Sequence, residues 1–355
     1  MTGMLAAAAA AADKVLYPAA AEVDRTGLVP DSHFALLAAE GFYGLFAPRE
    51  AGGPGLAFTE ALRVVETLAG GCLATTFVWL QHHGIVMALL MTPNTELRAR
   101  LLAPAVRGEV RGGGAFSGVV HTPPRVRAVR RPGGWSVSGR VPFVSGWGIV
   151  DLLHVSAHDE TTGEVVSGLV NACPGPGIAA VEPLTLVAGQ GTNTVSLELR
   201  DLVLPDEQVT TRTDRAAFLA GLAIGLRVDS ALALGLTDRA VRLLAEAEPK
   251  AADALRSERD DLRDRFDTAL GEPDRLPALR AACSELTQRA CTALVVAGGG
   301  AALSAGHPAQ RLAREALFTL VVASRPAVRS RLLDLLAGPA DLGRVPALAA
   351  VGGRR

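Results

Sequence analysis

Lysine is almost absent from this sequence of 355 residues. Only Lys14 and Lys250 occur, so arginine supplies nearly all of the 35 basic residues, which face 36 acidic ones. The formal net charge of −1 leaves no excess of basic side chains, and such an excess is what a nucleic-acid or anionic-membrane surface requires. We therefore expect no nucleic-acid partner.

Cysteine is sparse as well. The four residues Cys72, Cys173, Cys283 and Cys291 form no C-x-x-C pair, and no histidine stands at metal-ligand spacing from them. Scattered cysteines are typical of reduced thiols rather than of a disulfide framework or a zinc site. The sequence predicts no metal site and a cytoplasmic location.

Long apolar runs are also missing, although 49% of the residues are hydrophobic. The runs at 216–226 and 292–306 are too short, or too rich in glycine, to cross a bilayer, which takes ~20 residues. The N-terminus begins Met-Thr-Gly-Met-Leu, continues with alanines, and lacks the basic region of a signal peptide. We expect a packed globular protein without membrane insertion.

The spacing of apolar residues changes twice along the chain. Up to residue 112 it is helical, from 113 to 206 short segments alternate between apolar and polar residues, and after that the helical spacing returns. Strands are predicted at 113–119, 151–157, 165–171 and 194–204, and so many short strands fit a small antiparallel barrel or sandwich. The predicted fold class is α+β, with an N-terminal α-helical domain (1–112), a middle β domain (113–206) and a C-terminal four-helix bundle (207–355).

The segment 133–148 is the most informative part of the β domain. Apolar residues alternate with serines over 135–138, Gly139-Arg140 can form a tight turn, and alternation resumes at 141–143, which predicts a β-hairpin. The segment then reads Phe-Val-Ser-Gly over 143–146, placing an aromatic ring, a hydroxyl and exposed backbone beside a glycine. These groups suit the wall of a pocket for a flat, hydrogen-bonding ligand; alternatively, the hairpin packs only on its own core.

His82 and His83 are adjacent in a predicted helix. Neighbouring residues point to different sides of a helix, so at most one of them can face a given site. A structural role in the core or at the surface is the simpler interpretation.

In the order of its parts, the chain resembles the acyl-CoA dehydrogenase superfamily over nearly its full length. Each matching stretch is a weak pattern alone, but together they stand in order and at compatible spacing. They are Gly41–Leu56 (GFYGLFAPREAGGPGL), Leu101–Glu109 (LLAPAVRGE), 135–148, 195–205, and the glycines 298–300 leading to 310–315 (QRLARE).

The resemblance implies an FAD cofactor. In that family the β domain covers one face of the isoalloxazine, and an aromatic, an aliphatic and a hydroxyl residue in sequence contact the flavin edge; here this triplet looks like Phe143, Val144 and Ser145. The resemblance also places Phe116 and Ser117 on the strand whose backbone amides and hydroxyl meet the flavin pyrimidine. A ring to pack on, with donors for N5, O4 and O2, fits a cofactor whose electron density rises on reduction.

A run of three glycines resembles a second cofactor motif. Gly298, Gly299 and Gly300 correspond to the family's glycine motif near the adenosine half of FAD. The alternative is a plain break between two helices.

The sequence departs from the family at the catalytic base. Dehydrogenation between the α and β carbons needs a base for the α-proton, and the family usually supplies a glutamate at a position that matches Ala323 here. A second family position falls near Gly225, again without a carboxylate. Asp229 lies one helical turn further on, where an aspartate is more often a salt-bridge or solvent-facing group.

Two further family patterns are altered. An Arg-x-x-Phe-Gly that contacts the FAD pyrophosphate of a neighbouring subunit is missing after Gly235, and the late Arg263-Asp-Arg-Phe266 sits among acids that would repel a pyrophosphate, so we expect a surface helix there. The acidic and hydroxyl pattern expected after Ser117 is reduced to 118–124 (GVVHTPP). The family's contacts to an acyl thioester are therefore incomplete.

Three functions follow from the resemblance. The first is an FAD-dependent oxidoreductase acting at the CH–CH bond of an acyl thioester carried by coenzyme A or a carrier protein. The second is a flavin-dependent monooxygenase or oxidase of the same fold, which needs no α-proton base. The third is a non-catalytic paralogue that pairs with an active subunit.

The resemblance also implies self-association. In the family the C-terminal bundle packs against partner subunits, with FAD near that interface. A homodimer or homotetramer is expected, or a hetero-oligomer with a paralogue.

Overall fold

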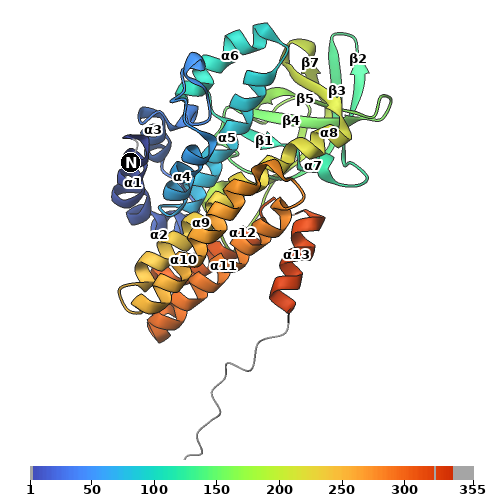
Figure 1. The fold of residues 1–355 in the computed structure, drawn as a ribbon. Helices are drawn as coiled ribbons and strands as arrows, with labels where there is room; N and C mark the ends of the chain where they lie inside the picture. The colour runs from blue at the N-terminus through green and yellow to red at the C-terminus, as the bar shows by residue number, and fades with distance from the viewer. Residues whose placement is uncertain (1–2, 324, 339–355) are drawn as a thin grey trace, which may run out of the picture.

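The computed structural model describes residues 3–323 and 325–338. Helices come first, a sheet follows, and helices return, and Figure 1 shows the two helical parts packed together with the sheet at one end of them. The N-terminal helices are α1 (Gly3–Ala11), η1 (Ala12–Leu16), α2 (Tyr17–Thr26), α3 (Asp31–Ala39), η2 (Phe42–Gly44), η3 (Arg49–Ala51), α4 (Phe58–Ala69), α5 (Leu73–Met91) and α6 (Thr95–Arg107).

Local signals set the ends of α6. The Asn94 side chain accepts a hydrogen bond from the Leu97 backbone N–H at 3.0 Å, and the helix stops before Gly108, which adopts a left-handed conformation. The preceding α5 is buried around most of its circumference. It is therefore a core helix, and it lies directly against β1.

The middle of the chain forms one mixed sheet. In the described residues eight strands are joined in the order β6-β7-β3-β2-β4-β5-β8, with β1 beside β4. Two pairings, β1 with β4 and β2 with β4, are parallel, whereas the sequence predicted an antiparallel domain. The strands are β1 (Gly112–Ala115), β2 (Val126–Arg131), β3 (Gly134–Val144), β4 (Leu152–Asp159), β5 (Glu164–Asn171), β6 (Ile178–Pro183), β7 (Val195–Pro205) and β8 (Val209–Asp214), and the short helix α7 (Ser117–Val120) follows β1.

The predicted turn at Gly139-Arg140 is wrong. β3 runs unbroken through both residues, and its hairpin partner is β2, so the turn lies at 132–133 instead. Gly139 marks a bulge in the pairing of β3 with β7, and a Cβ there would lie 2.0 Å from the Arg125 carbonyl oxygen. A glycine thus permits a close backbone approach here rather than a chain reversal.

The end of the sheet lies beyond residue 206. β8 (Val209–Asp214) pairs with β5, and α8 begins directly after it. We accordingly propose domain limits at 112 and 214 in place of 112 and 206.

The C-terminal part is a helical bundle. Its centre is α9 packed on α11, with α10 and α12 beside them. Leu232 and Leu236 of α9 share a core with Cys291 of α11. The elements are α8 (Arg215–Gly221), η6 (Leu222–Ile224), α9 (Gly225–Leu244), α10 (Pro249–Thr268), η7 (Ala269–Gly271), α11 (Leu276–Gly298), η8 (Gly299–Leu303), α12 (Pro308–Val321) and α13 (Pro326–Ala337).

Two helical stretches have the length and apolar composition of a membrane span: α5, and the continuous run 215–244. The second is longer than the apolar run read from the sequence, because α8, η6 and α9 follow one another without a break. Buried core helices pass the same test, and most of α5 is buried in the fold. The absence of membrane insertion remains a prediction.

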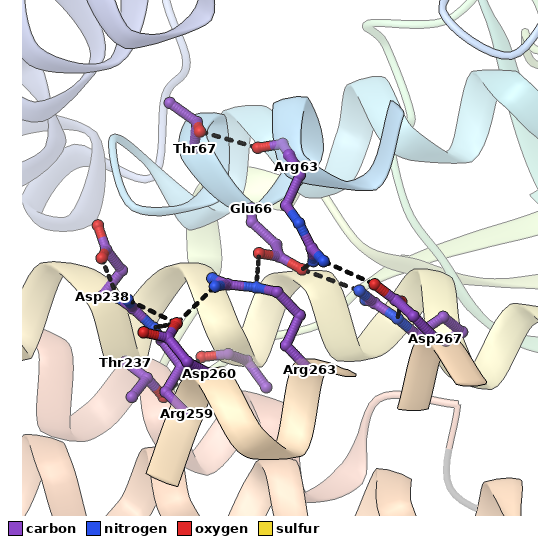
Figure 2. Close-up of polar contacts among 11 residues, drawn as sticks. Arg63, Glu66, Thr67, Thr237, Asp238, Arg259, Asp260, Arg263 and Asp267 are labelled. Carbon is purple, nitrogen blue, oxygen red and sulfur yellow. Dashed lines mark hydrogen bonds and ion pairs between the residues drawn. The ribbon is translucent and has the colours of Figure 1, made fainter. Parts of the chain in front are cut away.

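Ion pairs join α4 to α9 and α10, as Figure 2 shows. Glu66 of α4 accepts hydrogen bonds from Arg63 at 3.1 Å, from Arg227 at 3.1 Å and from Arg263 at 2.8 Å. Asp267 of α10 accepts from Arg63 at 2.6 Å and from the fully buried Arg227 at 2.7 Å. α10 is therefore not a simple surface helix, because Arg263 turns inward to the N-terminal part.

Candidate functional site

Phe143, Val144 and Ser145 stand at the end of β3 in three different environments. Val144 is buried and pairs with Val195 of β7. The pairing shifts register between Val141 and Val144, and Phe143 within this bulge has a φ of 54° and is 67% exposed. A large aromatic residue in the left-handed region is strained. The backbone thus holds an aromatic ring out of the sheet, toward solvent.

β1 brings Phe116 and Ser117 to the same place, but the predicted strand at 113–119 is too long: β1 ends at Ala115, and Ser117 begins α7. The Ser117 hydroxyl donates to the Pro142 carbonyl oxygen, next to Phe143. A Cβ at Gly113 would lie 3.3 Å from the Ser145 carbonyl oxygen, so β1 passes close beside the end of β3. The structure therefore unites the two segments that the sequence singled out separately.

The ring of Phe116 lies close to Gly114 of β1. A Cβ at Gly114 would stand 2.9 Å from Cε1 of Phe116 and 3.5 Å from Oε1 of Gln81 on α5. Phe116 itself is 36% exposed. A side chain at position 114 would collide with the Phe116 ring, so the glycine makes room for the ring, and the Gln81 amide lies near the same point.

A chain of hydroxyl groups stands behind Ser145. Its Oγ lies 2.7 Å from Oγ1 of Thr194, which lies 2.7 Å from Oγ1 of Thr192. All three residues are buried. The sequence interpretation missed both threonines; the signal available was a Thr-Asn-Thr just before a strand.

These residues fit the edge of a flavin ring. Phe143 and Phe116 present exposed aromatic surface. The three hydroxyl groups carry three hydrogens and make two hydrogen bonds to one another, so one hydrogen remains to be donated to an acceptor on a ligand. A flat heterocycle with carbonyl oxygens and ring nitrogens uses both features.

The three glycines lie at another place in the fold. Gly298 ends α11, and a Cβ on it would meet Ala302 at 3.0 Å and His307 at 3.3 Å. Gly299 has a φ of 54°, and a Cβ on Gly299 or Gly300 would meet nothing within 4 Å. Their recorded neighbours belong to the bundle rather than to β3, so their role near an adenosine group remains a prediction.

Ala323 follows α12 on an exposed turn. Its φ is 50°, and it carries no acid. The turn is held by Arg280 of α11, which donates to the carbonyl oxygens of Thr319 at 2.7 Å and of Val322 at 3.3 Å. The usual position of the base is thus occupied by an ordered turn without a proton acceptor.

Asp229 of α9 shares the surroundings of Arg280. Burial raises the pKa of the Asp229 carboxyl to about 6, although the charges of Arg280 and Arg325 act to lower it. No ion pair closer than 4 Å to this carboxyl is found among the described residues. The Asp229 carboxyl therefore titrates about one pH unit below neutrality and is mostly ionised at pH 7.

The two histidines are both core residues. His82 Nε2 lies 3.0 Å from the Ala105 carbonyl oxygen, and its Nδ1 accepts from the Gly112 N–H at 3.0 Å. Burial lowers the pKa of His82 to about 4. The ring nitrogens of His83 have no hydrogen-bond partner within the described part of the chain. Neither ring is free for proton transfer at the β3 site.

A separate hollow of about 670 Å³ lies between the loop around η3 and α6. No residue of β1 or β3 is among its described lining residues. In the described ranges, moreover, no three His, Cys, Asp or Glu side chains are grouped so that they could hold a metal ion. The hollow therefore adds no residue to the β3 site.

A family model described as "Acyl-CoA dehydrogenase, N-terminal domain" matches residues 3–109. The chain is 27% identical over 155 residues to benzylmalonyl-CoA dehydrogenase of Aromatoleum aromaticum. The aligned stretch covers 41% of this chain and 40% of that protein. Residues 3–109 thus match the N-terminal domain of the acyl-CoA dehydrogenase family, and longer stretches of the chain are similar to members of that superfamily.

Solved structures extend the likeness in fold to almost the whole chain. A glutaryl-coenzyme A dehydrogenase matches with a TM-score of 0.82 at 18% identity, covering 94% of both chains. Methanesulfinate monooxygenase of Pseudomonas fluorescens matches with a TM-score of 0.75 at 16% identity, covering 95% of this chain and 97% of that one. The alignments to curated relatives span only about half of those proteins, so activity has to be inferred from the site.

Proposed function

We propose that this protein is an FAD-dependent oxidoreductase that acts on an acyl thioester, carried by coenzyme A or a carrier protein, at its CH–CH bond. Family membership supports oxidoreductase chemistry in general, and the curated relatives at 21–27% identity include enzymes named for acyl-CoA substrates. The observation that carries the proposal is the grouping of Phe143, Ser145, Phe116 and Ser117 beside one another.

Each of these residues has a defined task in the proposed site. The exposed rings of Phe143 and Phe116 supply surface on which the flavin packs, and the Ser145 hydroxyl donates a hydrogen bond at the flavin edge. Ser117 is bonded to the Pro142 carbonyl and so holds β1 against the end of β3. Bound FAD would supply the acceptor for a hydride, and Val144 anchors the strand that presents the site.

The proton acceptor is the unusual part of the proposed reaction. Ala323 cannot take the α-proton, so Asp229 is the candidate base in this proposal, with a pKa raised to about 6 by burial. A carboxyl that titrates close to neutral pH is suited to accept a proton. The charges of Arg280 and Arg325 favour its ionised form, which is the form that would accept the α-proton and become neutral.

Absorbance spectroscopy tests the proposal. Purified protein, as isolated or after incubation with FAD, should show flavin bands, and an acyl-CoA panel added without oxygen should bleach them. Asp229→Asn should retain the bands and lose the bleaching. Protein that takes up no flavin would overturn the proposal, and bleaching that survives Asp229→Asn would overturn the assignment of the base.

One observation favours a second candidate. Ala323 removes the usual base, and a flavin-dependent monooxygenase or oxidase needs none; a methanesulfinate monooxygenase shares the fold. Oxygen consumption with reduced flavin, measured on amine, phenol and sulfinate substrates, separates the two candidates. Uptake above that of free flavin supports the second, and uptake equal to it argues for the first.

Self-association is part of the proposal. Exposed aliphatic side chains on the bundle give a surface that a second copy can cover: Val296, Leu303, Leu317 and Val321. We propose a homodimer or homotetramer, and a hetero-oligomer with a paralogue as the alternative. Light scattering should give a multiple of the 36.7 kDa chain mass, and a monomer would contradict it. The cytoplasmic location and the absence of a nucleic-acid partner rest on composition alone.

A further inference from the structure

The hydroxyl chain behind Ser145 has an end that is closed and an end that is open. Thr192 is 0% exposed, Thr194 is 5% exposed, and Ser145, next to the exposed Phe143, is 7% exposed. Two contacts of 2.7 Å join the three oxygens, with Thr194 in the middle.

Counting hydrogens gives the chain a direction. Three O–H groups fill two hydrogen bonds, so one hydrogen is left over on one of the three residues. If that hydrogen belonged to Thr192 or to Thr194, it would be buried with no other acceptor recorded in the described residues. Buried donors without partners are strongly disfavoured. The favoured order is Thr192 donating to Thr194 and Thr194 donating to Ser145, which leaves the Ser145 hydrogen at the open end.

The backbone around the chain fixes its closed end. The Thr192 N–H donates to the Gly189 carbonyl at 2.9 Å, and the Thr192 carbonyl accepts from the Gly146 N–H at 2.8 Å. The residue between the threonines, Asn193, has a φ of 45°, and its carbonyl accepts from the Trp147 N–H at 3.2 Å. The loop that carries both threonines is thus tied to the residues directly after Ser145.

We infer that Thr192 and Thr194 are positioning residues that hold the Ser145 hydroxyl as a hydrogen-bond donor toward a ligand acceptor, such as a ring carbonyl oxygen or ring nitrogen. This inference rests on the proposed function, because the ligand is the flavin ring. Because Ser145 accepts from Thr194 in this order, its own hydrogen is not used within the chain and is free to be donated to the ligand. The hydrogen bonds of such a chain reinforce one another, which strengthens the donor at its open end.

A set of matched substitutions tests the inference through FAD affinity. Thr194→Val keeps the shape and removes the hydroxyl, whereas Thr194→Ser keeps the hydroxyl. Fluorescence titration should show Thr194→Val raising the Kd for FAD about three- to tenfold, the range expected for one hydrogen bond, with Thr194→Ser within about twofold of the wild type. The flavin absorption bands should shift in Thr194→Val and keep their positions in Thr194→Ser.

Repeating the Thr194→Val substitution in a Ser145→Ala protein shows whether Thr194 acts by positioning the serine hydroxyl or only by packing. When Ser145→Ala is already present, adding Thr194→Val should have little further effect on the Kd, because the threonine acts only through the serine. An equal loss of affinity in both backgrounds would overturn the inference. Thermal unfolding of the apo variants shows whether each is folded, and Thr194→Ser covers the case in which Thr194→Val does not fold.

The two proposals fail in different ways. If the wild-type protein takes up no FAD, the proposed function fails and the inference fails with it. If the wild type binds FAD while Thr194→Val binds it equally well with unshifted bands, only the inference is overturned.

Discussion

Asp229 is a residue whose buried environment disfavours the ionised form of its carboxyl. Its carboxyl is partly enclosed between α9 and α11, and burial raises its pKa from 3.8 to about 6 in spite of two nearby arginines. At a pH between these two pKa values, the folded protein binds more protons than the unfolded chain. Stability conferred through this group must therefore fall as pH rises from about 4 to about 6.

The first prediction removes this titration. Asp229→Asn should leave stability near pH 4 unchanged and increase the free energy of unfolding at pH 7 by about 1–3 kcal/mol, because a shift of about two pKa units corresponds to ~3 kcal/mol. Urea unfolding of both proteins across this pH range measures it. Asp253→Asn, at an exposed pair with Arg256, is the control and should not alter the pH slope. A constant difference between Asp229→Asn and wild type at every pH would contradict the prediction.

Phe143 is a second residue held in an unfavourable state. Its side chain is exposed and its backbone is in the left-handed region, which costs about 1–3 kcal/mol for a residue other than glycine. Such strain is retained where the side chain has a function outside the core.

The second prediction follows from this strain. Phe143→Gly should maintain or raise the melting temperature, since glycine adopts this conformation freely, while FAD binding weakens about tenfold or more from the loss of the stacked ring. Scanning calorimetry of the apo protein and a flavin titration give the two values. Val203→Gly, at an exposed strand position of β7, should lower the melting temperature and spare FAD binding. A fall in stability for Phe143→Gly would contradict the interpretation.

Part of the residue-level site could be read from the sequence. The triplet at 143–145 was found from its place at the end of a predicted hairpin and from the family resemblance, and the pair at 116–117 from the resemblance alone. The structure brings the two segments together. The φ of Phe143 could not be found, since it comes from a register shift against β7, a partner about 50 residues away. Thr192 and Thr194 were missed for the same reason: only the pairing places them behind Ser145.

At the scale of elements, α4 and α9 cross at a glycine. A Cβ on Gly235 would lie 2.2 Å from the Glu66 carbonyl oxygen and 2.9 Å from Cβ of Ala69. The two helices approach so closely because no side chain separates them. The main-chain contact then brings Glu66 within reach of Arg227.

The third prediction compares two helical glycines. Gly235→Ala should destabilise the protein by about 2–4 kcal/mol, because backbone atoms must move apart. Gly221→Ala, in α8, meets nothing within 4 Å and should stabilise it by about 0.4–1 kcal/mol. Chemical denaturation of both variants measures the difference. The same sign of effect at both positions would contradict the role of the crossing.

Element boundaries show what sequence patterns can and cannot determine. Sequence patterns located β4, β5 and β7 to within a few residues. Buried and exposed positions alternate in the second half of β7, whereas β5 is buried at every position from 165 to 169. Gly139-Arg140 was taken as a turn since glycine followed by a polar residue suits one, whereas β7 on one side and β2 on the other keep that stretch extended. β2, β6 and β8 are short and largely exposed. Their sequences therefore lack the alternation of apolar and polar residues from which a strand is predicted.

At the scale of the whole molecule, the ion pairs of Figure 2 fasten the N-terminal helices to the bundle. Arg239 of α9 extends this attachment, donating to the Gly70 carbonyl at 2.7 Å and pairing with Asp13. The order of helical, sheet and helical parts was predictable from the changes in periodicity. The attachment between the parts was not, because charged residues on α10 look solvent-exposed when their partners lie about 200 positions away.

The fourth prediction tests this attachment. Glu66→Gln leaves the buried Arg227 with Asp267 as its one recorded acidic partner in the described chain, and breaking a buried pair typically costs 3–5 kcal/mol. We expect unfolding at a denaturant concentration lower by a corresponding amount. Glu22→Gln, at the exposed pair with Arg25, should leave the midpoint unchanged. Equal midpoints for Glu66→Gln and wild type would show that the network adds nothing.

The same attachment bears on how the chain can be divided. Residues 3–109 match a family model as a domain of their own, yet Glu66 and Asp13 in that segment find their arginine partners on α9 and α10. An excised fragment ending near residue 111 would expose the face of α4 that α9 covers, would remove the arginine partners of Asp13, and would leave Glu66 with Arg63 alone. We therefore expect that this segment does not fold on its own, although a family model matches it as a domain. A truncation series should give aggregation-prone fragments until the bundle is restored.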